Sequence, residues 1–408
     1  MDYILRNVSK RLGGSDFNKL NNNFKFSKIK KLKKEIVNKY PDIPLIDLGI
    51  GEPDLPADIK VINTLKDEAY KPENRLYSDN GIYEFKLAAC NYLKNIFNVD
   101  IDPDTEILHG LGAKSILSLL PYCFINPGDI TITTIPGYPV LATHTKYLDG
   151  KVYNLKLTKE NNFLPDLDSI PKKILKNGKL IYINYPNNPT GQIANKDFYK
   201  RLIDFSYKND LIVISDSVYA NIVYDTSPLS FLSIDGAKDI GVEIHSLSKS
   251  FNMTGWRLAF IAGNKDIIKL YSIIKSNSDS GQFRAIQKAG ISALNNPDIV
   301  KSNIKRYSRR FELLINALKE VGFSLEKPKG TYFCYTKIPK GTKSGIIFKN
   351  AEEVSDFLLK KALISTVPWD DAGSYLRFSV TFIAKDYKEE KEIINTLKER
   401  LKKLELLF

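Results

Sequence analysis

The chain has 408 residues, enough for two domains, and its hydrophobic content of 43% and charged content of 26% are those of ordinary globular proteins. The net charge of +13 comes from lysines spread along the whole chain, which is typical of a solvated surface rather than of a nucleic-acid site. No run of about 18 apolar residues predicts a membrane-spanning helix, and the first residues lack a secretory signal pattern. We therefore expect a cytoplasmic protein without nucleic-acid or membrane partners.

The cysteines and histidines do not predict a metal site. Cys90, Cys123 and Cys334 are far apart in the chain and form no CxxC pair. The three histidines share no metal-ligand spacing. We expect neither a disulfide framework nor a bound metal ion.

The first elements along the chain are an arm, a basic helix and a short strand. In KFSKIKKLKKEIVNK (25–39), apolar residues recur at helical spacing, which predicts an amphipathic helix with its lysines in solvent. LIDLGIGEPDLP (45–56) predicts a strand followed by a loop rich in glycine and proline. The apolar periodicity of EFKLAACNYLKNIF (84–97) predicts a second helix.

Apolar, β-branched strands alternate with helical stretches between about residues 105 and 263. Strands that are apolar along their whole length predict a mostly parallel sheet covered by helices on both faces, and therefore an α/β fold. In such sheets, binding groups gather outside the carboxyl ends of the strands. The polar motifs of this chain directly follow the predicted strands.

The pattern changes from about residue 295, where a long charged helix is followed by alternating strands and helices. This stretch predicts a smaller α+β domain. We expect an N-terminal arm and helix (1–45) that belong to the small domain, a large cofactor-binding domain (46–294) and a small C-terminal domain (295–408).

Three motifs follow strands of the predicted sheet. HGLGAKS (109–115) opens a helix after a glycine turn, and backbone N–H groups at a helix start bind anions. NYPNNPTG (184–191) places Asn188 in a polar turn, although Asn-Pro is also an ordinary turn former. ISDSVYA (214–220) ends a buried strand on Asp216, a carboxylate that needs a positive partner, either a ligand or a structural cation. Tyr219 is close enough in sequence to reach the same ligand.

The strongest motif is SLSKSFNMTGWR (246–257). Ser246, Ser248 and Arg257 carry donors suited to a phosphate, because the planar guanidinium matches its oxygens. Lys249 is suited to form a Schiff base with a cofactor aldehyde, which requires a pocket that keeps its amine neutral. Arg377 stands alone in the apolar strand SYLRFSVTF (374–382), where it suits a substrate carboxylate or a core ion pair.

These motifs, in this order, resemble those of the class I/II (fold type I) aminotransferases, which use pyridoxal 5′-phosphate (PLP). The resemblance runs from LGIGEPD to LRFSVTF and covers most of the chain. It implies ping-pong transfer of an amino group between an amino acid and 2-oxoglutarate, and a homodimer with shared active sites. One position departs from the pattern, since Ser217 follows Asp216 where many relatives have an acidic residue, but Tyr219 keeps its spacing.

The resemblance also implies a role for each motif residue. Lys249 would hold the cofactor covalently and move the proton at the substrate Cα, and Asp216 would pair with the pyridinium nitrogen. Asn188 and Tyr219 would contact the phenolate oxygen of the ring. The other implied cofactor contacts are Tyr138 on the ring face, Tyr77 at the phosphate of the neighbouring subunit, and Gly112, Ala113, Lys114, Ser246, Ser248 and Arg257 at the chain's own phosphate. The implied substrate contacts are Gly51, Asn188 and Arg377.

Within the family, LGIGEPDLP, GAKS, HSLSKSFNMTGWR and KSNSDSGQFRAIQKAGI (275–291) are most similar to LL-diaminopimelate aminotransferases of bacteria and archaea. That activity interconverts LL-diaminopimelate and 2-oxoglutarate with tetrahydrodipicolinate and glutamate, for lysine and peptidoglycan synthesis. Asp370 and Asp371 suit the distal ammonium of diaminopimelate, or of ornithine, lysine or arginine, but also a solvated loop. Asn277 and Gln282 suit a substrate contact or the cap of the following helix.

Three other functions stay open. One is an aminotransferase of broader specificity for aspartate, alanine or aromatic amino acids. Another is an oxidase, decarboxylase or lyase that acts on a basic amino acid, which amine transfer dependent on a keto acid would exclude. The third is a regulator or structural partner without catalysis, which the presence of Lys249, Asp216, Arg257 and Arg377 disfavours.

Overall fold

A computed structural model describes residues 3–16 and 25–408, so residues 1–2 and 17–24 of the predicted arm lie outside the described residues. The chain divides into two compact units. The larger unit comprises residues 51–312 and 326–334, and the smaller unit comprises residues 1–50, 313–325 and 335–408. The limits that the sequence suggests, after residues 45 and 294, stay a proposal about functional domains.

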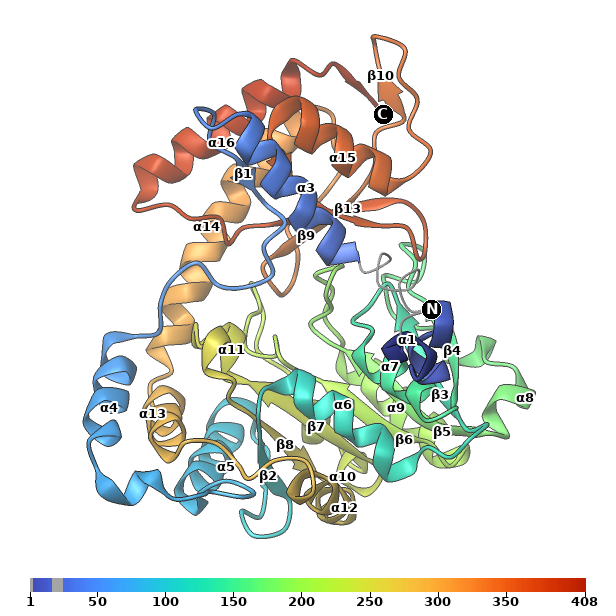
Figure 1. Ribbon diagram of the computed structural model, residues 1–408, viewed down its shortest axis with the longest axis vertical. Coiled ribbons are helices and arrows are strands. Elements are labelled where there is room, and N and C mark those ends of the chain that lie inside the picture. Colours follow the sequence, from blue (N-terminus) through green and yellow to red (C-terminus); the bar gives the residue numbers. More distant parts are fainter. Residues whose placement is uncertain (1–2, 17–24) are drawn as a thin grey trace. The chain divides into compact units, whose positions relative to one another are not determined.

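The larger unit is built on a seven-stranded sheet (Figure 1). Its strands are β2 (Ile107–Gly110), β3 (Ile130–Ile135), β4 (Lys151–Lys156), β5 (Gly178–Asn184), β6 (Ile212–Asp216), β7 (Gly241–Ser246) and β8 (Ala259–Gly263). Their order is β2-β8-β7-β6-β5-β3-β4, and only β8 pairs antiparallel with its neighbours. The prediction of a mostly parallel sheet is confirmed.

Helices cover both faces of this sheet. The longer helices of the larger unit are α4 (Ile59–Ala69), α5 (Tyr83–Phe97), α6 (Ala113–Phe124), α7 (Val140–Tyr147), α9 (Lys196–Lys208), α12 (Lys265–Ser276), α13 (Arg284–Leu294) and the first part of α14 (Asp298–Glu320), and the short ones are α8 (Lys172–Leu175), α10 (Ala237–Ile240) and α11 (Leu247–Ser250). Alternate strand residues face opposite sides: Leu108 and Ile214 pack with α6, α7 and α12, whereas Ile107 and Val213 pack with α5, α9 and α13. Because both faces are covered, the strands are apolar along their length.

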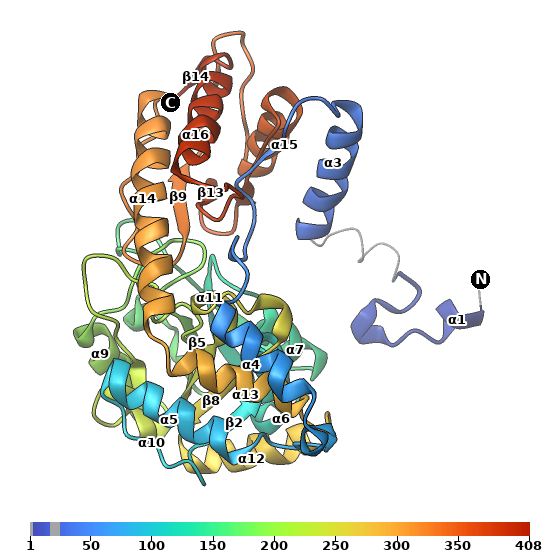
Figure 2. The same cartoon turned by 90° about the vertical axis from the view of Figure 1, so that its left-hand side faces the viewer.

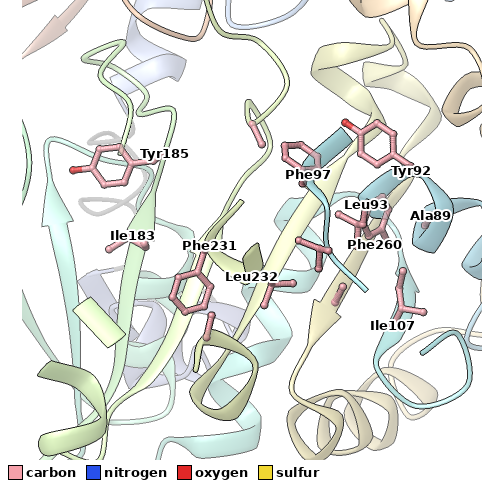
Figure 3. Packing of buried hydrophobic residues seen from close by; sticks show 14 of the residues in the cluster. Ala89, Tyr92, Leu93, Phe97, Ile107, Ile183, Tyr185, Phe231, Leu232 and Phe260 are labelled. Atoms are coloured by element: carbon pink, nitrogen blue, oxygen red, sulfur yellow. The ribbon is translucent and has the colours of Figure 1, made fainter. Parts of the chain in front are cut away.

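Aromatic side chains fill the core between α5 and the sheet (Figure 3). Tyr92 meets Phe97 and Phe260 edge-on, with ring centroids 5.7 and 6.4 Å apart. The helix predicted over 84–97 is confirmed as α5. Asn98 follows its last residue in a left-handed backbone conformation (φ 56°), which asparagine adopts more easily than most residues.

Helices α4, α5 and α13 pack side by side on one side of the larger unit (Figure 2). The segment around α4 leaves several large apolar or aromatic side chains in solvent. Ile59, Tyr70 and Tyr77 are 64%, 80% and 78% exposed. Each of these side chains leaves apolar surface in contact with water.

The smaller unit combines helices with short strands. Its helices are α1 (Tyr3–Arg6), α3 (Lys25–Lys39), α15 (Ala351–Ala362) and α16 (Tyr387–Lys402), and its strands are β1 (Ile46–Asp47), β10 (Gly341–Thr342), β11 (Ile364–Ser365), β12 (Val367–Trp369), β13 (Tyr375–Ser379) and β14 (Leu406–Leu407); β9 (Phe333–Lys337) and α14 contribute residues to both units. The helix predicted over 25–39 is confirmed as α3, whose Ile36 packs with Leu359 and Leu363. β13 lies between β12 and β9, and β1 pairs in parallel with β11. Across both described stretches of the chain, no helix is long and apolar enough to cross a membrane.

Candidate active site

The residues predicted to bind the cofactor follow five strands of the larger sheet. β2 leads to Gly112, β3 to Tyr138, β5 to Asn188 and β7 to Lys249, while Asp216 is the last residue of β6. These strands all run in one direction, because β2 and β7 both pair antiparallel with β8 and the others pair in parallel. Their carboxyl ends therefore lie at one edge of the sheet, where open α/β sheets bind ligands.

Gly112 and Arg257 lie against each other at the start of α6. A Cβ atom on Gly112 would lie 2.2 Å from Nη2 of Arg257, and the Gly112 backbone has φ +83°, so glycine is required here. Nη1 of Arg257 donates to the carbonyl oxygen of Thr254 at 2.7 Å. The N–H groups of Ala113 and Lys114 are in the first turn of α6, where a helix offers them no acceptor. Guanidinium and N–H groups together suit an anion.

Ser246 and Ser248 shape the turn that carries Lys249. Oγ of Ser246 accepts a hydrogen bond from the Ser248 N–H at 3.2 Å and so caps α11. The Ser248 carbonyl accepts from the hydroxyl of Thr254 at 3.0 Å. Both serines are buried, which fixes the start of α11 against the end of β7.

Lys249 contacts the loop that follows LGIG. Its Nζ donates to the carbonyl oxygen of Gly51 at 2.7 Å, and the hydroxyl of Tyr332 donates to the same oxygen at 2.8 Å. The ring of Tyr219 meets that of Tyr332 edge-on, with centroids 5.4 Å apart. Gly51 thus offers its carbonyl to Lys249. The sequence interpretation missed Tyr332.

Asp216 is 3% exposed, and the two groups that donate hydrogen bonds to its carboxylate are neutral. The hydroxyl of Tyr182 donates to its Oδ2 at 2.8 Å, and the Val218 N–H lies 3.4 Å from Oδ1. Within residues 3–16 and 25–408, no lysine, arginine or histidine forms a salt bridge with it. Burial raises the pKa of Asp216 to about 6, against the opposing effect of these two hydrogen bonds. The site therefore suits a ligand that brings a positively charged N–H group.

Two hydrogen-bond partners of Asp216 were not predicted from the sequence: one binds its carboxylate and the other its main-chain carbonyl. Tyr182 is fully buried in β5, and Asn184, two residues later, pairs in register with Asp216. Nδ2 of Asn184 donates to the Asp216 carbonyl at 2.8 Å, while its Oδ1 accepts the Asn188 N–H at 2.9 Å. Asn184 therefore joins the ends of β5 and β6. The polar residues at alternate positions of IYIN were the only available signal.

A buried ion-pair cluster holds the loop after Gly51. The carboxylate of Asp54 pairs with Nη2 of Arg306 at 2.6 Å and with Nη1 of Arg310 at 3.1 Å, both on α14. The Asp54 side chain is 2% exposed. These contacts link positions that are about 250 residues apart in sequence, and the sequence interpretation did not find them.

Two predicted site residues, Tyr77 and Arg377, do not follow the strands of the larger sheet. The Tyr77 side chain is in solvent, while its carbonyl accepts from Nη2 of Arg284 at 2.6 Å. Arg377 belongs to the smaller unit, where it is 2% exposed on β13 and donates from Nη2 to the Gly49 carbonyl at 3.2 Å.

Asp370 has a local structural partner. Its Oδ1 accepts the Ala351 N–H at 2.8 Å and its Oδ2 accepts the Glu352 N–H at 3.3 Å. These are first-turn groups of α15, so the carboxylate caps the helix, and its negative charge is stabilised by the positive end of the helix dipole. Of the readings that the sequence left open for Asp370, the structure favours a role in the loop itself.

A family model for aminotransferase class I and II matches residues 43–389. The chain belongs to the class I and II aminotransferases. It is 51% identical to the LL-diaminopimelate aminotransferase of Methanocaldococcus jannaschii, over 100% of this chain and 99% of that one. It is 50% identical to the protein of the same name from Methanococcus maripaludis, with the same coverage. The predicted family is confirmed, and with it a PLP-dependent transaminase that acts on amino acids and keto acids.

Solved structures with similar folds carry related names. Substrate-bound BacF from Bacillus subtilis has a TM-score of 0.85 at 31% identity, over 93% of this chain and 95% of that one. An aromatic aminotransferase from Pyrococcus horikoshii has a TM-score of 0.80 at 28% identity, over 90% and 99%. The predicted fold class, fold type I, is confirmed.

The residues at the sheet edge fit PLP. Burial raises the pKa of the Asp216 carboxyl group, because its charged form has lost contact with water. A protonated ring nitrogen would give this carboxylate a positively charged partner. The contact between Gly112 and Arg257, beside the first turn of α6, suits a phosphate. Lys249 supplies a primary amine, which can form a Schiff base with the aldehyde of PLP.

Proposed function

We propose that the chain is an LL-diaminopimelate aminotransferase, which interconverts LL-diaminopimelate and 2-oxoglutarate with tetrahydrodipicolinate and glutamate. The observation that carries the proposal is the identity of 51% and 50% with two archaeal proteins of that name along the whole chain. The sheet-edge geometry supports the chemistry, and the relatives support the substrate. Formation of LL-diaminopimelate would serve lysine and peptidoglycan synthesis.

The catalytic roles are part of the same proposal. When bound, PLP supplies an electron sink for negative charge at the substrate Cα. Lys249 holds the cofactor and moves the proton at Cα, for which its amine must be neutral. Asp216 keeps the ring nitrogen protonated, and Asn188 and Tyr219 hold the ring oxygen. The buried surroundings of Asp216 support its role, because an ion pair is stronger where water is excluded.

The other site residues bind and orient. Arg377 pairs with the substrate α-carboxylate through its planar guanidinium, with Gly51 and Asn188 as further substrate contacts. The ring face is covered by Tyr138. The proposed phosphate contacts are Gly112, Ala113, Lys114, Ser246, Ser248 and Arg257, with Tyr77 from the second subunit.

We also propose a cytoplasmic homodimer with shared sites. The exposed Ile59, Tyr70 and Tyr77 support it, since a second copy would cover apolar surface that is otherwise in contact with water. Tyr77 is anchored through its main chain while its side chain is free to reach a neighbouring subunit.

A half-reaction tests the proposed substrate. LL-diaminopimelate, glutamate, aspartate, alanine, ornithine and an aromatic amino acid would each be added alone to the PLP-loaded protein, and the absorbance band of the bound cofactor followed. We expect rapid loss of the band with LL-diaminopimelate and glutamate only. A preference for another donor would assign a broader or different aminotransferase specificity. No change with any donor, together with oxygen uptake on a basic amino acid, would move the protein to the oxidase class.

A further inference from the structure

The side chain of Gln282 bridges the two peptide groups that flank Arg257. Its Nε2 donates to the Trp256 carbonyl at 2.7 Å and to the Arg257 carbonyl at 3.0 Å. Arg257 lies between these carbonyls in a left-handed backbone conformation, with φ +58°. That conformation is unfavourable for a residue with a side chain, so it persists only where its surroundings hold it. The bridge by Gln282 is such a restraint.

His109 fixes which way the Gln282 amide points. The Nε2 atom of His109 lies 3.0 Å from Oε1 of Gln282, while its buried Nδ1 has no hydrogen-bond partner in the described part of the chain. His109 is fully buried, and burial lowers its pKa to about 4, so the ring is neutral and has one N–H. That N–H must be on Nε2, because two acceptors would otherwise face each other. The Gln282 nitrogen is thereby directed at the two carbonyls.

The main chain of Gln282 is tied to the segment that carries Tyr77. The hydroxyl of Ser78 donates to the Gln282 carbonyl at 2.7 Å and accepts the Gln282 N–H at 3.0 Å. Gly281 allows this approach, because a Cβ there would lie 2.4 Å from Oγ of Ser78 and its φ is +85°. Arg284 adds a second tie to the carbonyl of Tyr77. Gln282 thus joins the turn that contains Arg257 to the backbone next to Tyr77.

We propose that Gln282 is a positioning residue for the cofactor phosphate. Its amide holds Arg257 in the backbone conformation that brings the guanidinium against Gly112, and its main chain holds the segment of Tyr77 at the same point. The inference rests on the proposed function, because the phosphate contacts of Arg257 and Tyr77 belong to that proposal. For Gln282 the sequence had left open a substrate contact or a helix cap, and this proposal adds a third role.

The test separates phosphate binding from general stability. Cofactor-free protein would be titrated with PLP and, separately, with pyridoxal, which lacks the phosphate. The quantity to compare is the affinity for PLP divided by the affinity for pyridoxal. Gln282→Glu is nearly isosteric, but its carboxylate faces two carbonyl oxygens and cannot donate. We expect the ratio to fall by about tenfold or more, as for the loss of one charge-assisted contact, with little change for pyridoxal alone. The loss should be smaller at pH 5.5 than at pH 8, because the introduced carboxyl group can donate one hydrogen bond once it is protonated.

Matched variants make each outcome decisive. Gln192→Glu introduces the same charge at a glutamine whose amide donates to Asn162, away from Arg257, and should leave the ratio unchanged. Arg257→Ala should lower the ratio by itself. If it does not, the proposed phosphate site fails; if it does and Gln282→Glu has no effect, only the role of Gln282 is overturned. If the affinity ratio fell equally in Gln192→Glu, the role of Gln282 would also be overturned. Should Gln282→Glu not fold, Gln282→Met, which removes the amide without adding charge, gives the same measurement.

Discussion

Replacing Asp216 by asparagine is expected to stabilise the cofactor-free protein while it weakens PLP binding. The folded protein raises the pKa of Asp216 from the ordinary 3.8 to about 6, chiefly by burial. Each pKa unit corresponds to about 1.4 kcal/mol, so the charged carboxylate destabilises the folded state by about 3 kcal/mol. Asparagine removes this charge but also an acceptor near the Val218 N–H, which costs up to about 1 kcal/mol. A net gain of about 2 kcal/mol remains.

The sign of the pH dependence follows from the raised pKa. Between about pH 4 and pH 6 the folded protein binds more protons at Asp216 than the unfolded chain does, so its stability falls as the pH rises through this window. Above that window the penalty is complete and constant. The advantage of Asp216→Asn should therefore be small at pH 4, grow up to about pH 6 and then stay level.

Thermal unfolding of the cofactor-free proteins between pH 4 and pH 8 tests this expectation. Midpoints are the quantity to compare, because a chain with two units need not unfold in one step. Asp204→Asn, at an exposed position of α9, controls for the loss of one negative charge. Addition of PLP should raise the midpoint of the wild-type protein more than that of Asp216→Asn. An Asp216→Asn protein that melts below the wild type at pH 8 would refute the reasoning.

Three further substitutions address the site. Lys249→Ala should abolish amine transfer and leave the circular dichroism spectrum unchanged; normal turnover would exclude its catalytic role. Tyr182→Phe removes a hydrogen bond that stabilises the charged form of Asp216, so the pKa of that carboxyl should rise and the acid limb of PLP affinity should move to higher pH by about one unit. An unmoved limb would show that Tyr182 does not tune the carboxylate. Gly112→Ala places a methyl group 2.2 Å from Nη2 of Arg257 at φ +83°, and PLP affinity should fall by about tenfold or more, whereas unchanged affinity would contradict the proposed phosphate site.

The local patterns of the sequence predicted several elements and their order along the chain. The helical spacing in 25–39 and 84–97 predicted α3 and α5, and the apolar runs before Asp216 and Ser246 predicted β6 and β7. A parallel sheet places the carboxyl ends of such strands at one edge, so the sequence alone was enough to group the motifs that follow them. The residue roles within that group stay a proposal.

Contacts between distant segments could not be predicted in this way. Asp54 and Arg306 both read as ordinary charged residues, and only the packing of α14 shows that they pair. The hydrogen bonds of Asp370 to the first turn of α15 likewise join segments whose contact the sequence does not show.

The sequence alone determined the fold class and the family, and it predicted several elements and most of the proposed site residues, because these depend on spacings of a few residues and on an ordered set of motifs. The tertiary structure decided which neighbours those residues have. The register between β5 and β6 puts Asn184 opposite Asp216, and the approach of the segment containing Gln282 to Arg257 gives that arginine its restraint. Register and long-range packing are set by how whole faces fit together, and no short stretch of sequence carries that information.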